Sequence, residues 1–136
     1  MREDWLEHIK AMSPEDQYKY FLNRVAEFEV LWGLYDEKNN GWAMTVSDEN
    51  KERLALWPEP EMARLNAQDV WKKYRTETLD LYGFLEHGIE ELEAADRGVS
   101  IMYIPDYGGL EVELPYLARD LREAIHIEEE EANSSE

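Results

Sequence analysis

The N-terminal part of the chain repeats its apolar residues at the spacing of a helix. One such stripe predicts a short helix over residues 3–12, and its members are Trp5, Leu6, Ile9 and Met12. Ser13 and Pro14 favour a new helix directly afterwards, because serine caps a helix end and proline suits the first helical position. A second stripe predicts that helix over residues 14–28, with Tyr18, Phe21, Leu22, Val25 and Phe28 on one face.

After this helix the pattern changes to short apolar runs between polar turns. The runs at 30–35, 42–46 and 53–57 are too short for helices and favour strands. The segments 36–41 and 47–51 between them contain Asn, Asp, Gly and Ser, which are typical of tight turns. We therefore expect a three-stranded antiparallel meander.

The middle of the chain returns to helical patterns. Residues 60–74 are helical in composition, but the spacing is imperfect at 66–69, so we expect a break or two short helices there. Residues 76–79 can form a brief extended piece. Asp80 is a candidate N-cap for a helix that we expect to end at Gly98. This helix has the clearest apolar stripe in the chain, which consists of Leu81, Phe84, Leu85, Gly88, Ile89, Leu92 and Ala95.

The C-terminal part predicts a hairpin and a last helix. Strands are expected at 99–104 and 110–114, the second with strict alternation of apolar and polar residues, and the loop 105–109 joins them. Pro115 opens the helix, whose inward residues are Leu117, Leu121 and Ile125.

The order of elements predicts an α+β fold. Helices flank an antiparallel or mixed sheet made of the meander and the C-terminal hairpin. We expect one domain over residues 1–127 and a disordered acidic tail over residues 128–136.

Composition adds a strong negative charge to this picture. The 136 residues include 32 acidic and 14 basic side chains, and the formal net charge is −18. The last nine residues hold only five of the acids, so the charge belongs mainly to the folded part. Such a charge disfavours direct nucleic-acid binding and anionic membranes and favours a basic protein partner. The simpler interpretation is that the charge keeps the protein in solution.

The chain contains no cysteine, which excludes disulfides, thiolate metal sites and a cysteine nucleophile. The N-terminus is charged and lacks the apolar segment of a signal peptide, and no apolar run approaches the length of a membrane span. A cytoplasmic location is therefore expected.

The chain contains a series of aromatic motifs, namely Tyr20-Phe21-Leu22, Val30-Leu31-Trp32-Gly33-Leu34, Gly41-Trp42-Ala43 and Leu56-Trp57-Pro58. Together these motifs resemble a bacterial family of domains of unknown function, the family numbered 2750. The resemblance covers roughly residues 18–122 and implies the same fold class and a bacterial origin. It implies no activity and no site residue.

The residues of these motifs have a structural interpretation of their own. Trp32, Trp42 and Trp57 fall on consecutive predicted strands, where they can stack across the sheet as part of the core. The alternative is an aromatic cage that binds a ligand.

The sequence lacks the common motifs for catalysis and for cofactor binding. His8, His87 and His126 fall on three different predicted helices. His87 has Glu90 and Glu91 at the spacing of a shared metal site, but a helix so rich in glutamate produces this spacing by chance. The chain has no G-x-S-x-G motif, phosphate-binding loop or calcium loop. We predict no enzyme activity, no cofactor and no metal.

One candidate site remains, on the helix near residues 80–97. Glu86, Glu90 and Glu93 lie opposite its apolar stripe, either as a solvated face or as a surface that docks a basic partner. We therefore expect a non-enzymatic interaction module, for example an immunity or inhibitor protein that neutralises a toxin, acting as a monomer or a homodimer. The alternatives are a nucleic-acid mimic that inhibits a DNA- or RNA-binding protein, and a small carboxylate-dependent hydrolase or ligand binder.

Overall fold

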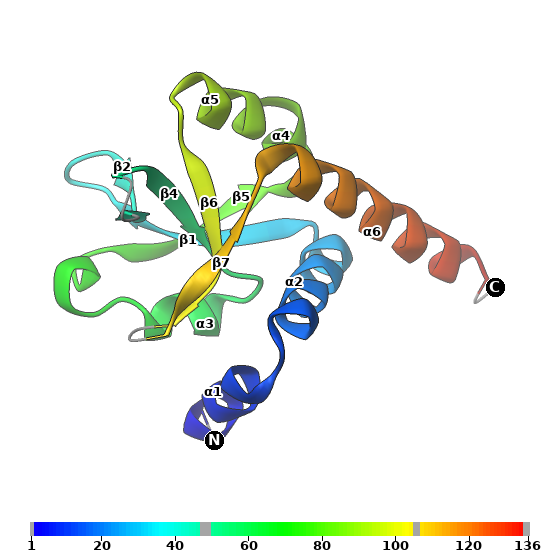
Figure 1. Cartoon of the computed structure of the whole chain (residues 1–136), viewed down its shortest axis with the longest axis horizontal. Coiled ribbons are helices and arrows are strands. Elements are labelled where there is room, and N and C mark those ends of the chain that lie inside the picture. The colour runs from blue at the N-terminus through cyan, green and yellow to red at the C-terminus, as the bar shows by residue number, and fades with distance from the viewer. Residues whose placement is uncertain (1, 47–49, 105–106, 135–136) are drawn as a thin grey trace.

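The protein is known from a computed structural model, which describes residues 2–46, 50–104 and 107–134. It has the predicted α+β fold, with helices around two sheets (Figure 1). Its elements in chain order are α1 (Arg2–Ala11), α2 (Pro14–Phe28), β1 (Val30–Asp36), β2 (Gly41–Trp42), β3 (Met44–Val46), β4 (Glu52–Leu56), α3 (Pro60–Leu65), the 3₁₀ turn η1 (Asp69–Trp71), β5 (Arg75–Asp80), α4 (Leu81–Gly83), the π-helical segment η2 (Phe84–Gly88), α5 (Ile89–Ala94), β6 (Gly98–Ile104), β7 (Gly108–Val112) and α6 (Leu114–Ser134).

The start of α2 follows the predicted capping chemistry. Ser13 Oγ accepts a hydrogen bond of 3.1 Å from the N–H of Asp16, and Pro14 occupies the first turn. The helix ends at Glu29, whose backbone is left-handed with φ 61°. Phe21 and Val25, members of the predicted stripe, are fully buried, whereas Phe28 at its C-terminal end is 56% exposed. Local sequence signals therefore set both the position and the inward face of this helix.

The predicted meander is divided between two sheets. Within the described residues, β2 pairs with β1 in a sheet of order β2-β1-β5, and β3 pairs with β4 in a sheet of order β3-β4-β6-β7. Ala43 stands between β2 and β3. Its N–H donates to Leu34 O at 2.8 Å, and its carbonyl accepts from the N–H of Ala55 at 3.2 Å. The middle strand thus bends at Ala43 and serves both sheets, so the expected single meander is wrong in this respect.

The two sheets are joined again where β1 and the end of β4 approach each other. Trp32 and Trp57 exchange two backbone hydrogen bonds of 2.8 Å in antiparallel orientation. The bent strand β2–β3 lies between the diverging parts of β1 and β4. We call this arrangement the fork: β1 and β4 are paired at Trp32 and Trp57 and separate beyond that pair.

Two strands, β5 and β6, are defined by pairing with strands that are far away in the sequence. The brief extended piece expected at 76–79 is β5, which pairs antiparallel with β1 from Val30↔Asp80 to Tyr35↔Arg75. The strand β6 is almost completely buried and pairs parallel with β4 and antiparallel with β7. The presence of both pairings makes this second sheet a mixed one.

The helix after β5 begins as expected but ends earlier than Gly98. Asp80 Oδ2 accepts a hydrogen bond of 2.9 Å from the N–H of Gly83, as an N-cap does. At the other end, Asp96 takes the left-handed conformation with φ 56°, and the N–H of Arg97 donates to Leu92 O at 2.8 Å. Asp96 therefore fills the C′ position that was expected for Gly98, because aspartate tolerates this conformation better than most residues. Gly98 begins β6 instead.

The last helix is longer than expected. Residues 128–134 continue α6 where a disordered tail was predicted, and the final turns project beyond the sheets in Figure 1. Glutamate and alanine are good helix formers, so the acidic run extends a helix that Leu117 and Leu121 already anchor in the core.

Some expectations fall partly outside the described residues. These are residues 47–49 of the predicted turn at 47–51, residues 105–106 of the predicted hairpin loop, and residues 135–136 of the tail. The side chain of Trp5, from the first predicted stripe, also lies outside.

A bulge in the hairpin β6–β7 provides a partner for a buried indole. The pairing shifts between Ile101 and Ile104, and Met102 has a positive φ of 60°. The carbonyl of Tyr103, in this irregular stretch, accepts a hydrogen bond of 2.9 Å from Trp57 Nε1. Trp57 is completely buried, so its N–H needs such an acceptor.

Gly109 faces this bulge and has no room for a side chain. A β-carbon there would overlap Ser100 Oγ and lie 2.9 Å from the carbonyl oxygen of Ile101. We expect Gly109→Ala to lower the free energy of unfolding by about 2–3 kcal/mol, because the backbone must move to relieve the overlap. Urea denaturation measures this loss. The control is Gly41→Ala, where a β-carbon meets no atom within 4 Å. Equal stability of the two variants would contradict the close approach.

A partly buried polar contact connects α2 to α6. The Tyr18 hydroxyl donates to Asp120 Oδ2 at 2.6 Å, and Arg119 Nε donates to Asp120 Oδ1 at 3.0 Å. Burial raises the pKa of Tyr18, and the hydrogen bond to Asp120 raises it further. Burial opposes ionisation of Asp120, but the bonds from Tyr18 and Arg119 outweigh it and hold its pKa below the ordinary value. The carboxylate form is therefore the one that stabilises this contact.

Removal of the Tyr18 hydroxyl should weaken the fold in a pH-dependent way. We expect Tyr18→Phe to cost about 1–2 kcal/mol at pH 7, at the lower end for a hydrogen bond to a charged group because the contact is only partly buried. The lowered pKa of Asp120 contributes stability above its unfolded-state value and loses it in acid, so the difference from the parent should shrink below about pH 4. Urea denaturation at several pH values tests this. Tyr107→Phe, at a side chain 67% exposed, is the control and should change little. A Tyr18→Phe penalty that stays constant into acid would contradict the role of Asp120.

Candidate functional site

The predicted acidic residues are exposed on the helix that crosses from β5 to β6. Glu86 lies in η2, and Glu90 and Glu93 lie in α5; all three side chains are exposed. The opposite side of the same helix is buried in the core through Phe84, Leu85, Ile89 and Leu92. Between residues 81 and 96 the chain contains no Lys or Arg, and His87 Nε2 lies 3.9 Å from a carboxylate oxygen of Glu86. We call Glu86, Glu90 and Glu93 the acidic face.

The segment α4–η2–α5 lies antiparallel to the first half of α6. Tyr82 and Leu85 line one cleft together with Ile125 of α6. Glu93, at the other end of the segment, lines a second cleft with Pro115 of α6. The two clefts therefore mark the ends of one helix–helix contact, and the acidic face runs between them.

The first cleft is a small groove with an apolar floor, which we call the interhelical groove. It encloses about 260 Å³, and its lining residues are Tyr82, Leu85, Glu86, Arg122 and Ile125. Tyr82 is 42% exposed. Ile125 was expected to point inward and is half-buried at the edge of the core.

Carboxylates from several elements surround Tyr82. A hydrogen bond with Glu29 raises the pKa of its hydroxyl, with smaller contributions from burial and from the negative charges of Glu29, Glu129 and Asp80. Glu29 follows α2, whereas Glu129 belongs to α6. Sequence reasoning missed this groove, because its residues are about 40 positions apart and the only local signal was Tyr82 beside the apolar stripe.

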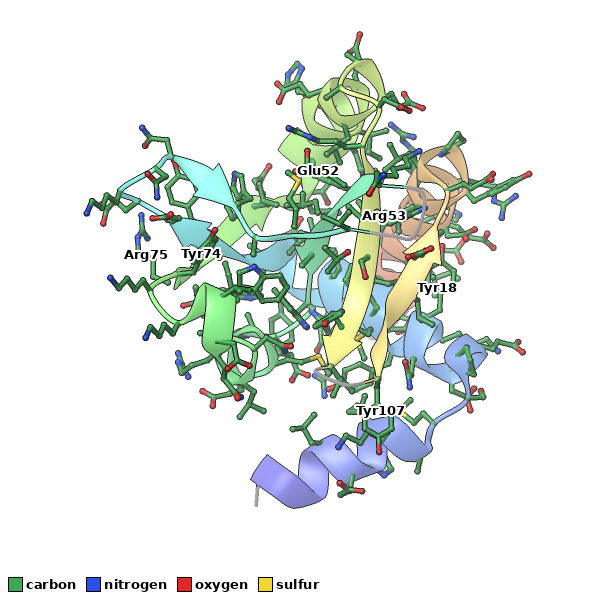
Figure 2. The ribbon with its side chains drawn as sticks, turned by 60° about the vertical axis from the view of Figure 1, so that its left-hand side comes forward. Tyr18, Glu52, Arg53, Tyr74, Arg75 and Tyr107 are labelled. Carbon is green, nitrogen blue, oxygen red and sulfur yellow. The ribbon has the colours of Figure 1, made fainter. Side chains whose placement is uncertain are left out.

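The second cleft is polar and is held by ion pairs. It encloses about 570 Å³ where β4, β6 and β7 meet the start of α6. Three pairs surround it, namely Lys51–Asp96 at 3.8 Å, Arg53–Glu111 at 3.4 Å and Arg97–Glu52 at 3.1 Å. Figure 2 labels Glu52 and Arg53 here. Each of these cations faces an acid, so the cleft offers a balanced network rather than a site of one charge.

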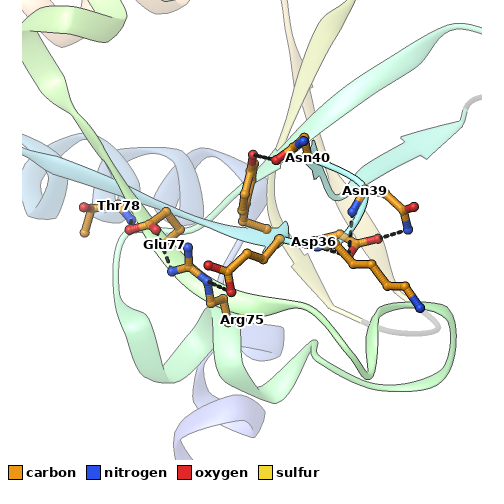
Figure 3. Close-up of polar contacts among 9 residues, drawn as sticks. Asp36, Asn39, Asn40, Arg75, Glu77 and Thr78 are labelled. Carbon is orange, nitrogen blue, oxygen red and sulfur yellow. Dashed lines mark hydrogen bonds and ion pairs between the residues drawn. The ribbon is translucent and has the colours of Figure 1, made fainter.

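A third cleft of about 740 Å³ lies between the β1–β2 turn and η1. Asp36 Oδ2 accepts a hydrogen bond of 2.6 Å from Asn39 Nδ2, which fixes the turn. Beside it, Arg75 contacts Glu77 at 2.6 Å and Glu37 at 3.7 Å (Figure 3). Hydrogen bonds to Arg75 and to the N–H of Thr78 lower the pKa of Glu77. These polar groups thus satisfy one another.

The tryptophans of the conspicuous motifs take part in packing. Trp57 contacts the ring of Trp71 edge-on at 6.2 Å, and Trp71 contacts Tyr103 at 5.7 Å. Trp42 contacts Tyr35 at 5.0 Å, on the other side of the fork. These contacts support the core interpretation of the motifs.

The described residues hold neither a cluster of metal ligands nor a membrane-spanning helix. In that part of the chain, no three His, Asp or Glu side chains gather as metal ligands, and His8, His87 and His126 are exposed on separate helices. No helix there combines the length and apolar character needed to cross a membrane.

Comparison with known proteins gives one match. Residues 18–121 match the family described as "Protein of unknown function (DUF2750)". Neither the curated proteins nor the solved structures contain a match to the chain.

Proposed function

Since the chain belongs to the DUF2750 family, whose description assigns no activity, we propose a function from its own surface: a non-enzymatic interaction module that binds a basic protein. The observation that supports this most directly is the acidic face. Glu86, Glu90 and Glu93 are exposed on a helix whose other side is fixed in the core. A rigid array of like charges attracts a basic partner at long range and orients it on arrival.

The clefts give less support to an enzyme. The two larger ones are lined mainly by charged side chains, whereas small-molecule sites are usually apolar with a few polar groups. A catalytic acid typically has a raised pKa. In the described part of the chain, the carboxyl groups of Glu77 and Asp120 have pKa values below the ordinary value. Both carboxyls are stabilised as anions, which suits structural ion pairs.

The interaction module fits the surface better than a nucleic-acid mimic does. A mimic needs carboxylates in an extended array that follows a phosphate backbone. Next to the acidic face, however, the polar cleft interleaves its acids with Lys51, Arg53 and Arg97. An immunity or inhibitor protein that neutralises a basic bacterial toxin is the concrete form of our proposal. The absence of cysteine suits a reducing cytoplasm.

Capture experiments with a charge variant test the proposal. The tagged chain is incubated with lysate of its source cells at low and moderate salt, and bound proteins are identified by mass spectrometry. We expect a basic protein that is retained at low salt and released as salt rises. The affinity of that purified protein should fall about tenfold or more when Glu86, Glu90 and Glu93 are changed together to Gln.

A matched control removes the same charge elsewhere. Glu7, Glu15 and Glu37 are exposed and form only surface ion pairs, so changing all three to Gln should preserve the fold. This control should weaken binding by about threefold or less, through the general field alone. An equal loss in both variants would show that net charge, and not the acidic face, attracts the partner. Capture of no basic protein at either salt would refute the proposal.

A further inference from the structure

The interhelical groove adjoins the acidic face, and Glu86 belongs to both. Its volume of about 260 Å³ is at or below the lower end for small-molecule sites, which usually span about 300–1,000 Å³. A groove of this size accommodates one or two side chains of a larger partner. It is therefore better suited to a protein surface than to a free metabolite.

The chemistry of the groove combines an apolar floor with a charged border, and further carboxylates act on Tyr82 from outside the lining. Tyr82, Leu85 and Ile125 provide the floor. Glu86 lies in the lining, and the charge of Glu129 acts on Tyr82 from α6. Arg122 is the one basic residue of the lining, and its aliphatic stem can add to the floor while its charge remains in water.

Charge complementarity indicates which kind of partner can occupy the interhelical groove. A second copy of this chain would bring another net charge of −18 against the carboxylates around Tyr82, and an anionic membrane is disfavoured for the same reason. A cationic partner gains from both the floor and the border. An interhelical groove with an apolar floor is also a recurrent docking site for an amphipathic helix.

We propose that the interhelical groove receives the apolar side of a basic amphipathic helix, whose Lys or Arg side chains face Glu86 and Glu129. This inference rests on the proposed function, because it specifies how the basic partner docks. The acidic face steers the partner toward the protein, and Tyr82 and Ile125 recognise its apolar residues. Binding then depends on the order of residues in the partner and not only on its charge.

The test uses a synthetic peptide as the partner. A helical peptide of roughly 18 residues carries Leu at positions i, i+3, i+4 and i+7 and Lys elsewhere. A second peptide has the same composition in an order that leaves no apolar side. Titration calorimetry at low salt should give a dissociation constant of about 100 µM or lower for the first peptide and about tenfold weaker binding for the second.

Variants on one helix locate the binding site. Ile125→Ser should weaken binding of the patterned peptide about fivefold or more, because it removes part of the floor. The control is Ile127→Ser on the same helix, where the side chain is 48% exposed and does not line the groove. Its binding should stay within about twofold of the parent. Tyr82→Ser provides a second floor variant if Ile125→Ser proves unstable, and circular dichroism checks each fold.

The outcomes separate this inference from the proposed function. Equal affinity for the two peptides, or an equal effect of Ile125→Ser and Ile127→Ser, would show attraction by charge alone and would overturn docking in the groove. The proposed role of the acidic face would then still be decided by the capture experiment. No binding of the patterned peptide at about 1 mM would also overturn docking. Failure of the Gln variant to affect the captured partner would instead refute the proposed function.

Discussion

The backbone pairing of Trp32 with Trp57 is the constraint on which the architecture depends. It joins two strands that diverge on one side, and the bent strand β2–β3 fills the space between them. Because β1 and β4 are already paired at this point, β5 and β6 must add to opposite outer sides, one in each sheet. The bulge beside Tyr103 completes the arrangement, since it offers an acceptor to the indole of Trp57.

The position of the acidic face follows from this arrangement. The chain leaves one sheet at β5 and enters the other at β6, and α4–η2–α5 is the connection between them. The connection buries Leu85 and Ile89 against the core, so its charged residues can only face water. Packing against α6 then leaves the groove at Tyr82 and Ile125. The candidate site thus lies on the connection between the sheets, next to α6.

Local chemistry made part of this structure predictable. Ser13 and Asp80 cap helices as expected, because a cap depends on neighbours within three residues. The division of the meander at Ala43 and the length of β5 depend on partners far away in the chain, and no local pattern encodes them. The exposure of Glu86 followed from helical period. Helical period did not predict the groove beside Glu86, because the groove depends on how two helices are aligned against each other.

The bent strand also determines where this fold tolerates a change in chain length. The β1–β2 turn is exposed, so an extra residue at Asn39 or Asn40 lengthens a loop and leaves all pairings in place. An extra residue between Trp42 and Met44 has a different effect. Side chains of a strand alternate between faces, so the insertion would turn every residue of β3 to the other side while β2 stayed in register. Natural length variation in this family should therefore concentrate in the turn and be absent at Ala43.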